Sequence, residues 1–151
     1  AIRAQLAAFD AAGIVPVIVA MHSFTPAWKG EPRPWHVTVL WDSDPRLPVP
    51  FLKALHAEPD LIVGDNEPYD GALKGDTMDQ HATRNGLAHA LIEVRQDLIA
   101  VHADATAWGM RLARILKPLA ADPSLHVKRT YVGRAAGRIH RAPTPYLEVQ
   151  P

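Results

Sequence analysis

Three apolar segments of the sequence predict strands that lie inside a sheet. Residues 15–19 form an almost unbroken apolar run, residues 35–41 read WHVTVLW, and residues 87–94 again carry closely spaced aliphatic side chains. A continuous apolar run is typical of a strand covered on both faces in a parallel sheet. A shorter strand is expected at residues 61–63. The pattern therefore predicts an α/β domain built on a largely parallel sheet.

Other apolar positions follow helical spacing. Residues 1–12 repeat apolar side chains every three or four positions, and Gly13 follows them where a helix commonly ends. Residues 105–120 have the clearest amphipathic pattern in the chain. Shorter helices are expected after Pro50 and over residues 77–85. These helices are expected to flank the sheet.

Polar side chains suited to catalysis lie at the ends of two of the predicted strands. His22 follows the first strand, and Glu93 and Arg95 lie at the end of the strand over residues 87–94. In open α/β sheets, ligands bind at the carboxyl ends of the strands. A histidine that holds a divalent metal and a carboxylate that takes a proton from water are two parts of an amide hydrolase. The alternative for His22 is a packed, hydrogen-bonded side chain at a strand end.

Composition narrows the functional classes. The chain has 151 residues, which fits one domain, and 16 basic residues balance 16 acidic residues, so no net charge favours nucleic acid or an anionic membrane. The absence of cysteine excludes disulfides and thiolate metal sites, and fits a cytoplasmic protein. No apolar run approaches the roughly 20 residues that cross a bilayer. A metal would therefore be held by histidine or carboxylate ligands.

Four sequence strings resemble the N-formylglutamate amidohydrolase family. They are AMHSFTP at residues 20–26, PWHVTVLWDSDPRL at 34–47, VGDNEPYDG at 63–71 and GLAHALIEVRQDLI at 86–99. The resemblance covers about residues 1–120. It implies a metal-dependent enzyme that splits N-formyl-L-glutamate into formate and glutamate, a step of histidine degradation. The family is distantly similar to zinc carboxypeptidases, which implies a mixed, largely parallel sheet flanked by helices, a zinc-exopeptidase-like fold.

The resemblance also implies roles for individual residues. His22 matches a zinc ligand that follows a strand, and Glu93 matches a general base at the end of a later strand. In this interpretation the metal lowers the pKa of its bound water toward about 7, Glu93 takes the proton, and Glu93 then protonates the leaving amine. A site of histidine and carboxylate ligands suits Zn²⁺, and also Co, Mn or Fe.

Five further residues are candidates for binding an N-acyl amino acid. Ser23 lies beside His22, and Asn66 and Tyr69 lie on a glycine-rich loop that is expected to overhang the site. Arg84 and Arg95 are candidates for the two glutamate carboxylates, because an arginine binds a carboxylate through two parallel hydrogen bonds. A structural ion pair is the alternative for each arginine.

The chain departs from the family pattern in one respect. Members of the family have a first half with a histidine motif that would supply the first metal ligands, and nothing here corresponds to it. Residues 1–121 are therefore expected to be the C-terminal half of an amidohydrolase domain that lacks its N-terminal part, and residues 122–151 a basic, flexible tail. An exposed sheet edge favours association with a second copy or with the missing half. The rival hypothesis is a non-catalytic half-domain that binds a partner.

Overall fold

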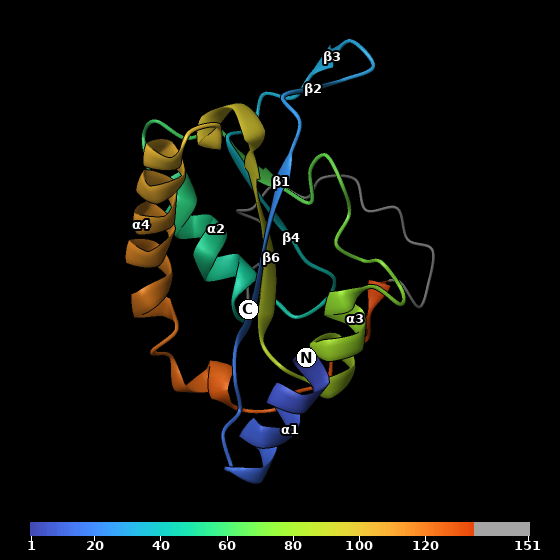
Figure 1. Ribbon diagram of the computed structural model, residues 1–151. Coiled ribbons are helices and arrows are strands. Elements are labelled where there is room, and N and C mark those ends of the chain that lie inside the picture. The colour runs from blue at the N-terminus through green and yellow to red at the C-terminus, as the bar shows by residue number, and fades with distance from the viewer. Residues whose placement is uncertain (135–151) are drawn as a thin grey trace.

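A four-stranded mixed sheet forms the centre of the molecule, with helices on both sides (Figure 1). The computed structural model describes residues 1–134. The helices are α1 (Ile2–Ala11), α2 (Pro48–His56), α3 (Thr77–His81) and α4 (His102–Leu119), with 3-10 turns at Thr83–Asn85, Gln96–Ile99 and Pro123–His126. The strands are β1 (Ile18–Phe24), β2 (Ala27–Trp28), β3 (Glu31–Pro32), β4 (Val37–Leu40), β5 (Val63–Asp65) and β6 (His89–Arg95).

The order of strands in the sheet is β1-β6-β4-β5. β1 runs parallel to β6 and β4 runs parallel to β5, whereas β4 and β6 are antiparallel. The short strands β2 and β3 pair with each other in a separate hairpin that projects from the end of β1 (Figure 1). The structure thus confirms the α/β class and the mixed sheet flanked by helices.

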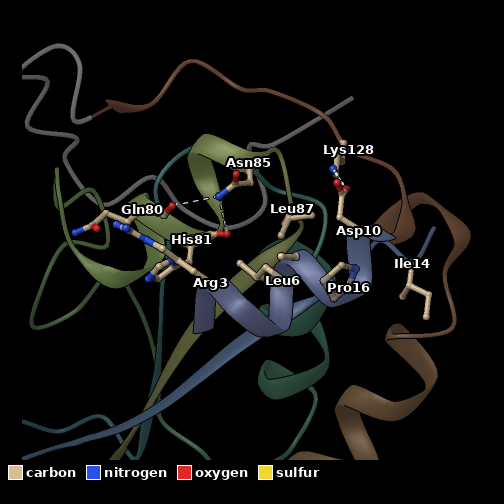
Figure 2. Close-up of a pocket in the computed structure, with 11 residues that line it drawn as sticks. Arg3, Leu6, Asp10, Ile14, Pro16, Gln80, His81, Asn85, Leu87 and Lys128 are labelled. Carbon is tan, nitrogen blue, oxygen red and sulfur yellow. Dashed lines mark hydrogen bonds and ion pairs between the residues drawn. The ribbon is translucent and has the colours of Figure 1, made fainter. Parts of the chain in front are cut away.

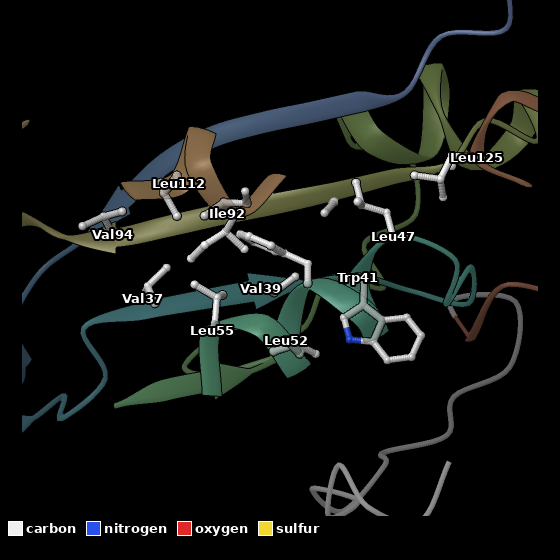
Figure 3. Packing of buried hydrophobic residues seen from close by; sticks show 14 residues of the cluster. Val37, Val39, Trp41, Leu47, Leu52, Leu55, Ile92, Val94, Leu112 and Leu125 are labelled. Atoms are coloured by element: carbon white, nitrogen blue, oxygen red, sulfur yellow. The ribbon is translucent and has the colours of Figure 1, made fainter. Parts of the chain in front are cut away.

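The main hydrophobic core lies between the sheet and the helices α2 and α4. Every second residue of the central strands, such as Val37 and Val39 on β4 and Ile92 on β6, is fully buried and faces these helices (Figure 3). Their partners on the helices include Phe51, Leu52 and Leu55 of α2 with Leu112 and Ile115 of α4. This packing fixes the other side chains of β4 and β6 on the opposite face.

Strand β1 differs from the fully buried strand that its apolar run predicts. The strand begins at Ile18 rather than at Val15, and it lies at an edge of the sheet, where it pairs with β6 alone within residues 1–134. Met21 is 53% exposed, and Val19 is also exposed. An apolar run therefore does not by itself distinguish an interior strand from an edge strand.

The segment expected as one helix over residues 77–85 is divided in two. Asp76 caps α3 by accepting a hydrogen bond from the Asp79 N–H at 2.7 Å, and α3 ends after five residues. The following 3-10 turn stops at Gly86, whose φ of 64° lies in the left-handed region that favours glycine. The other helices lie close to their expected positions.

Residues 122–134 pack against the body of the protein. Leu125 belongs to the main core, and the Arg134 guanidinium donates to the Trp41 carbonyl and pairs with Asp70 at 2.9 Å. These contacts join part of the segment that is expected as a flexible tail to the body of the protein. The remainder of that predicted tail, residues 135–151, lies outside the described residues. The domain boundary at residue 121 stays a prediction.

Candidate active site

The strand register aligns four residues in one row across the sheet. His22 on β1 pairs with Glu93 on β6, Glu93 pairs with Thr38 on β4, and Thr38 pairs with Gly64 on β5. Directly paired residues project from the same face of a sheet. This row lies on the face opposite α2 and α4, because the alternate residues of β4 and β6 point into the main core.

The row brings the two predicted catalytic residues together. His22 Nδ1 lies 3.7 Å from Glu93 Oε1, which is longer than a hydrogen bond. The Glu93 side chain is 8% exposed and the His22 side chain is 56% exposed. The second carboxylate oxygen, Glu93 Oε2, is buried without a hydrogen-bond partner in residues 1–134. A buried, unpaired carboxylate oxygen is costly for stability and is often found at functional sites.

Burial raises the pKa of the Glu93 carboxyl above its ordinary value. The charge of Arg33, and that of His22 when its ring is protonated, oppose this shift. Desolvation disfavours the carboxylate form, whereas a nearby cation favours it. The environment thus makes Glu93 a stronger base than a solvated carboxylate, which suits a group that both takes and returns a proton.

The far end of the row is packed too closely for a larger residue than glycine at position 64. The Thr38 hydroxyl donates to the Gly64 carbonyl at 3.0 Å. A Cβ atom on Gly64 would lie 2.9 Å from the Thr38 Oγ1 and 3.0 Å from the Trp35 ring. Glycine at this position therefore leaves room for the Thr38 hydroxyl and the Trp35 ring.

Asn66 shapes the loop after β5. Its φ is 54°, a left-handed conformation that asparagine tolerates better than most residues. Its Oδ1 accepts hydrogen bonds from the N–H groups of Trp41 and Gly71, both at 2.9 Å. Asn66 Nδ2 lies 3.4 Å from Asp65 Oδ1. These contacts occupy the side-chain oxygen of a residue that is predicted to bind the substrate.

The two predicted arginines have partners within the fold. Arg84 is exposed and forms an ion pair with Asp79 at 2.6 Å. Arg95 pairs with Asp97 at 2.7 Å and donates through Nη1 to the carbonyls of residues 33, 34 and 35. Arg95 thus lies near the site, and its hydrogen bonds fix the loop before β4. The structural alternative described for each arginine is therefore present.

Ser23 lies at the exposed end of β1, next to His22. Its Oγ accepts a long hydrogen bond of 3.4 Å from Gln96 Nε2. Tyr69 projects from the loop after β5, and its ring lies 5.0 Å from the guanidinium carbon of Arg33. The structure thus brings Tyr69 to the loop that leaves the His22 strand, a long-range contact that sequence spacing does not indicate.

Arg33 also lies near the site, although no local sequence pattern marks it as a site residue. It is 8% exposed, and its charge acts on Glu93. The Trp28 ring also lies over its guanidinium, at 5.7 Å. The available sequence signal was an arginine between two prolines in the loop that follows the predicted His22 strand.

The residues present do not complete a zinc site. No group of three or more histidine, cysteine, aspartate or glutamate side chains suited to one metal ion occurs within residues 1–134. A structural or catalytic zinc normally takes at least three protein ligands. His22 is the one candidate ligand among the predicted site residues, because Glu93 is assigned as the base, so further ligands would have to come from outside this part of the chain.

A separate hollow lies between α1 and α3 (Figure 2). Its volume is about 330 Å³, and its walls include Arg3, Leu6, His81 and Leu87. The ion pair between Lys128 and Asp10 borders it (Figure 2). None of the seven predicted site residues lines this hollow. Another hollow of about 490 Å³ contains Arg84 and is lined by residues near Tyr131.

The fold and the site together define the class of this protein. The molecule is an α/β protein with a buried carboxylate and an adjacent histidine on one face of a mixed sheet. The sequence model of the N-formylglutamate amidohydrolase family matches residues 1–100. The chain belongs to the N-formylglutamate amidohydrolase family.

A solved structure supports the fold. The chain is similar to the gene product Atu2144 from Agrobacterium tumefaciens, with 31% sequence identity and a TM-score of 0.74. The match covers 82% of this chain and 49% of the Agrobacterium chain, so this chain spans about half the length of that relative. No curated protein matches the sequence. The described residues contain no helix that is long and apolar enough to cross a membrane.

Proposed function

We propose that this chain carries the general base of a hydrolase that cleaves the C–N amide bond of N-acyl amino acids, with N-formyl-L-glutamate as the substrate. The observation that carries the proposal is the buried Glu93 carboxylate, which has an unpartnered oxygen and lies 3.7 Å from His22. Membership of the family supports amide hydrolysis as the reaction class. The products would be formate and L-glutamate, and the reaction would belong to histidine degradation.

In the proposed reaction, Glu93 moves one proton. It takes the proton from a water molecule as the water oxygen attacks the formyl carbon. It gives the proton to the amine nitrogen when the C–N bond breaks. Burial raises the pKa of Glu93, which brings the carboxyl closer to the range in which a group works efficiently as both base and acid.

Replacement of Glu93 tests this proposal. Glu93→Gln keeps the shape of the side chain but removes the base, so formate release from N-formyl-L-glutamate should fall by about 10²-fold to 10⁴-fold. Glu58→Gln is the matched control, because Glu58 forms an ion pair with Arg114 and neither residue belongs to the candidate site. Turnover by Glu93→Gln at the wild-type rate would exclude Glu93 as the base.

We also propose that the reaction depends on zinc, or on Co, Mn or Fe, with His22 as one ligand. Metal content measured by elemental mass spectrometry should fall in His22→Ala relative to wild type. Equal metal content in the two proteins would exclude His22 as a ligand. The zinc interpretation also requires ligands from outside residues 1–134, since the described side chains provide no set of three.

The incomplete ligand set favours a second candidate function. A half-domain without a full metal site would bind a partner, such as a second copy or a complementary chain, and would not catalyse hydrolysis. The formate assay separates the two candidates. No formate release by metal-supplemented wild-type protein would favour the binding function, whereas release that depends on Glu93 would favour the enzyme.

A further inference from the structure

Arg33 occupies a buried position on the loop that connects the β2-β3 hairpin to β4. Its backbone N–H donates to the Pro26 carbonyl at 2.8 Å, and its own carbonyl accepts from Arg95 Nη1 at 3.2 Å. Arg95 lies two residues after Glu93 on β6. The loop that carries Arg33 is therefore fixed to the strand that carries the candidate base.

Two aromatic rings and one hydroxyl hold the Arg33 guanidinium. Its central carbon lies 5.7 Å from the Trp28 ring and 5.0 Å from the Tyr69 ring, both within the range of cation–π contacts. Nη1 donates to Thr25 Oγ1 at 3.1 Å. The rings belong to the hairpin after β1 and to the loop after β5, and both side chains remain partly exposed. The guanidinium is thus oriented in advance at a surface that a ligand can reach.

Arg33 forms no ion pair in the described part of the chain, and the Glu93 carboxylate on which its charge acts lies beyond ion-pair distance. No carboxylate lies within 4.0 Å of it, whereas Arg84 pairs with Asp79 and Arg95 pairs with Asp97. Its Nε and Nη2 atoms make no hydrogen bond within residues 1–134, and neither is among the fully buried atoms that lack a partner. Burial of a cation without a counter-charge is unfavourable. The remaining donors are therefore free to bind an anion.

We propose that Arg33 binds a carboxylate of the substrate and thereby selects acyl amino acids that carry a free carboxylate group near the scissile amide. The inference rests on the proposed function. Arginine suits this role because its planar donors match the two oxygens of a carboxylate, and the stacked rings reduce the freedom lost on binding. Arg33 replaces Arg84 and Arg95 as the candidate because its guanidinium is the one of the three without a carboxylate partner.

The test compares substrates that differ in one carboxylate. Wild type, Arg33→Gln and Arg33→Lys are assayed with N-formyl-L-glutamate and with its two mono-amides, N-formyl-L-glutamine and N-formyl-L-isoglutamine. Arg33→Gln should lose about 100-fold in kcat/KM on N-formyl-L-glutamate, mainly through KM, and the loss should nearly disappear for the mono-amide that lacks the bound carboxylate. Arg33→Lys keeps the charge without the paired donors and should lose about 10-fold. Arg114→Gln is the control for loss of an exposed arginine.

An equal loss on all three substrates would overturn the proposal, because Arg33 would then act on Glu93 or on the fold rather than on a carboxylate. A second readout separates this result from failure of the proposed function. Trp28 lies over Arg33, so its fluorescence should change when L-glutamate binds. If wild type releases no formate but shows a fluorescence change that is absent in Arg33→Gln, the hydrolase proposal fails and the carboxylate site stands. No fluorescence change in wild type would overturn the carboxylate site.

Discussion

Arg46 shows at the scale of one residue how a buried ion pair connects distant segments. Its side chain and that of Asp44 are almost fully buried, and their closest atoms lie 2.6 Å apart. The Arg46 guanidinium also donates to the carbonyls of Ser124, at 3.0 Å, and Gly86, at 3.1 Å. The pair therefore joins the turn after β4 to the end of the 3-10 turn before β6 and to the segment after α4.

Arg46→Met is expected to lower the free energy of unfolding by about 3–5 kcal/mol, because it leaves the Asp44 carboxylate buried without its partner. Urea denaturation measures the change from the midpoint and slope. The matched control is Arg114→Met, which breaks an exposed pair with Glu58 and should cost about 1 kcal/mol or less. Equal effects of the two substitutions would contradict the structural role of Arg46.

The residues of the candidate site were predictable from the sequence to different degrees. Local patterns indicate His22 and Glu93, since each lies at the end of an apolar run. Parallel pairing of β1 with β6 then places them side by side. Arg33 does not follow from a local pattern. Its aromatic neighbours come from two different loops, and neither the burial of its side chain nor the absence of a carboxylate partner is encoded in sequence spacing.

At the scale of elements, the periodicity of apolar residues predicts where helices and strands lie in the sequence. It does not predict which strands pair or in which direction. The amphipathic pattern over residues 105–120 corresponds to α4, and the apolar runs correspond to β4 and β6. The run at residues 15–19 places β1 too early and in the interior, because Val15 and Pro16 precede the strand and the strand lies at an edge. The direction of β4 against β6 also depends on the connections between them, which apolar composition does not record.

The hairpin β2-β3 illustrates the same limit. Residues 26–34 contain three prolines and a glycine, which disfavour regular structure, and the strands that form here are two residues long. The hairpin nevertheless contributes Trp28 to the contact with Arg33. The hairpin lies at the end of β1, beside the candidate site (Figure 1).

At the scale of the whole molecule, His126 joins three segments that are distant in the sequence. Its Nδ1 lies 3.0 Å from the Val15 carbonyl and its Nε2 lies 2.8 Å from the Ala120 carbonyl. A carbonyl oxygen only accepts hydrogen bonds, so both contacts are hydrogen bonds only when both ring nitrogens carry protons. The protonated side chain thus links the segment before β1 to the end of α4.

These two carbonyls, with that of Ala120 contributing most, raise the pKa of His126 above its ordinary value of 6.5. The negative charge of Asp122 acts in the same direction. Because the folded protein holds the proton more tightly than the unfolded chain, the stabilising contribution is fully present below about pH 6.5 and decreases as the pH rises through the folded pKa.

We expect wild type to exceed His126→Gln in free energy of unfolding by the largest amount near pH 5.5 and by a shrinking amount from about pH 6.5 upward. Glutamine can donate to one carbonyl but carries no titrating charge, so the difference isolates the proton on His126. Urea denaturation of both proteins across this pH range gives the difference at each pH, and it cancels the contributions of the other titrating groups. His56→Gln controls for the loss of a histidine elsewhere in the fold. A difference that stays constant, or that grows as the pH rises, would show that His126 does not link the segments through a bound proton.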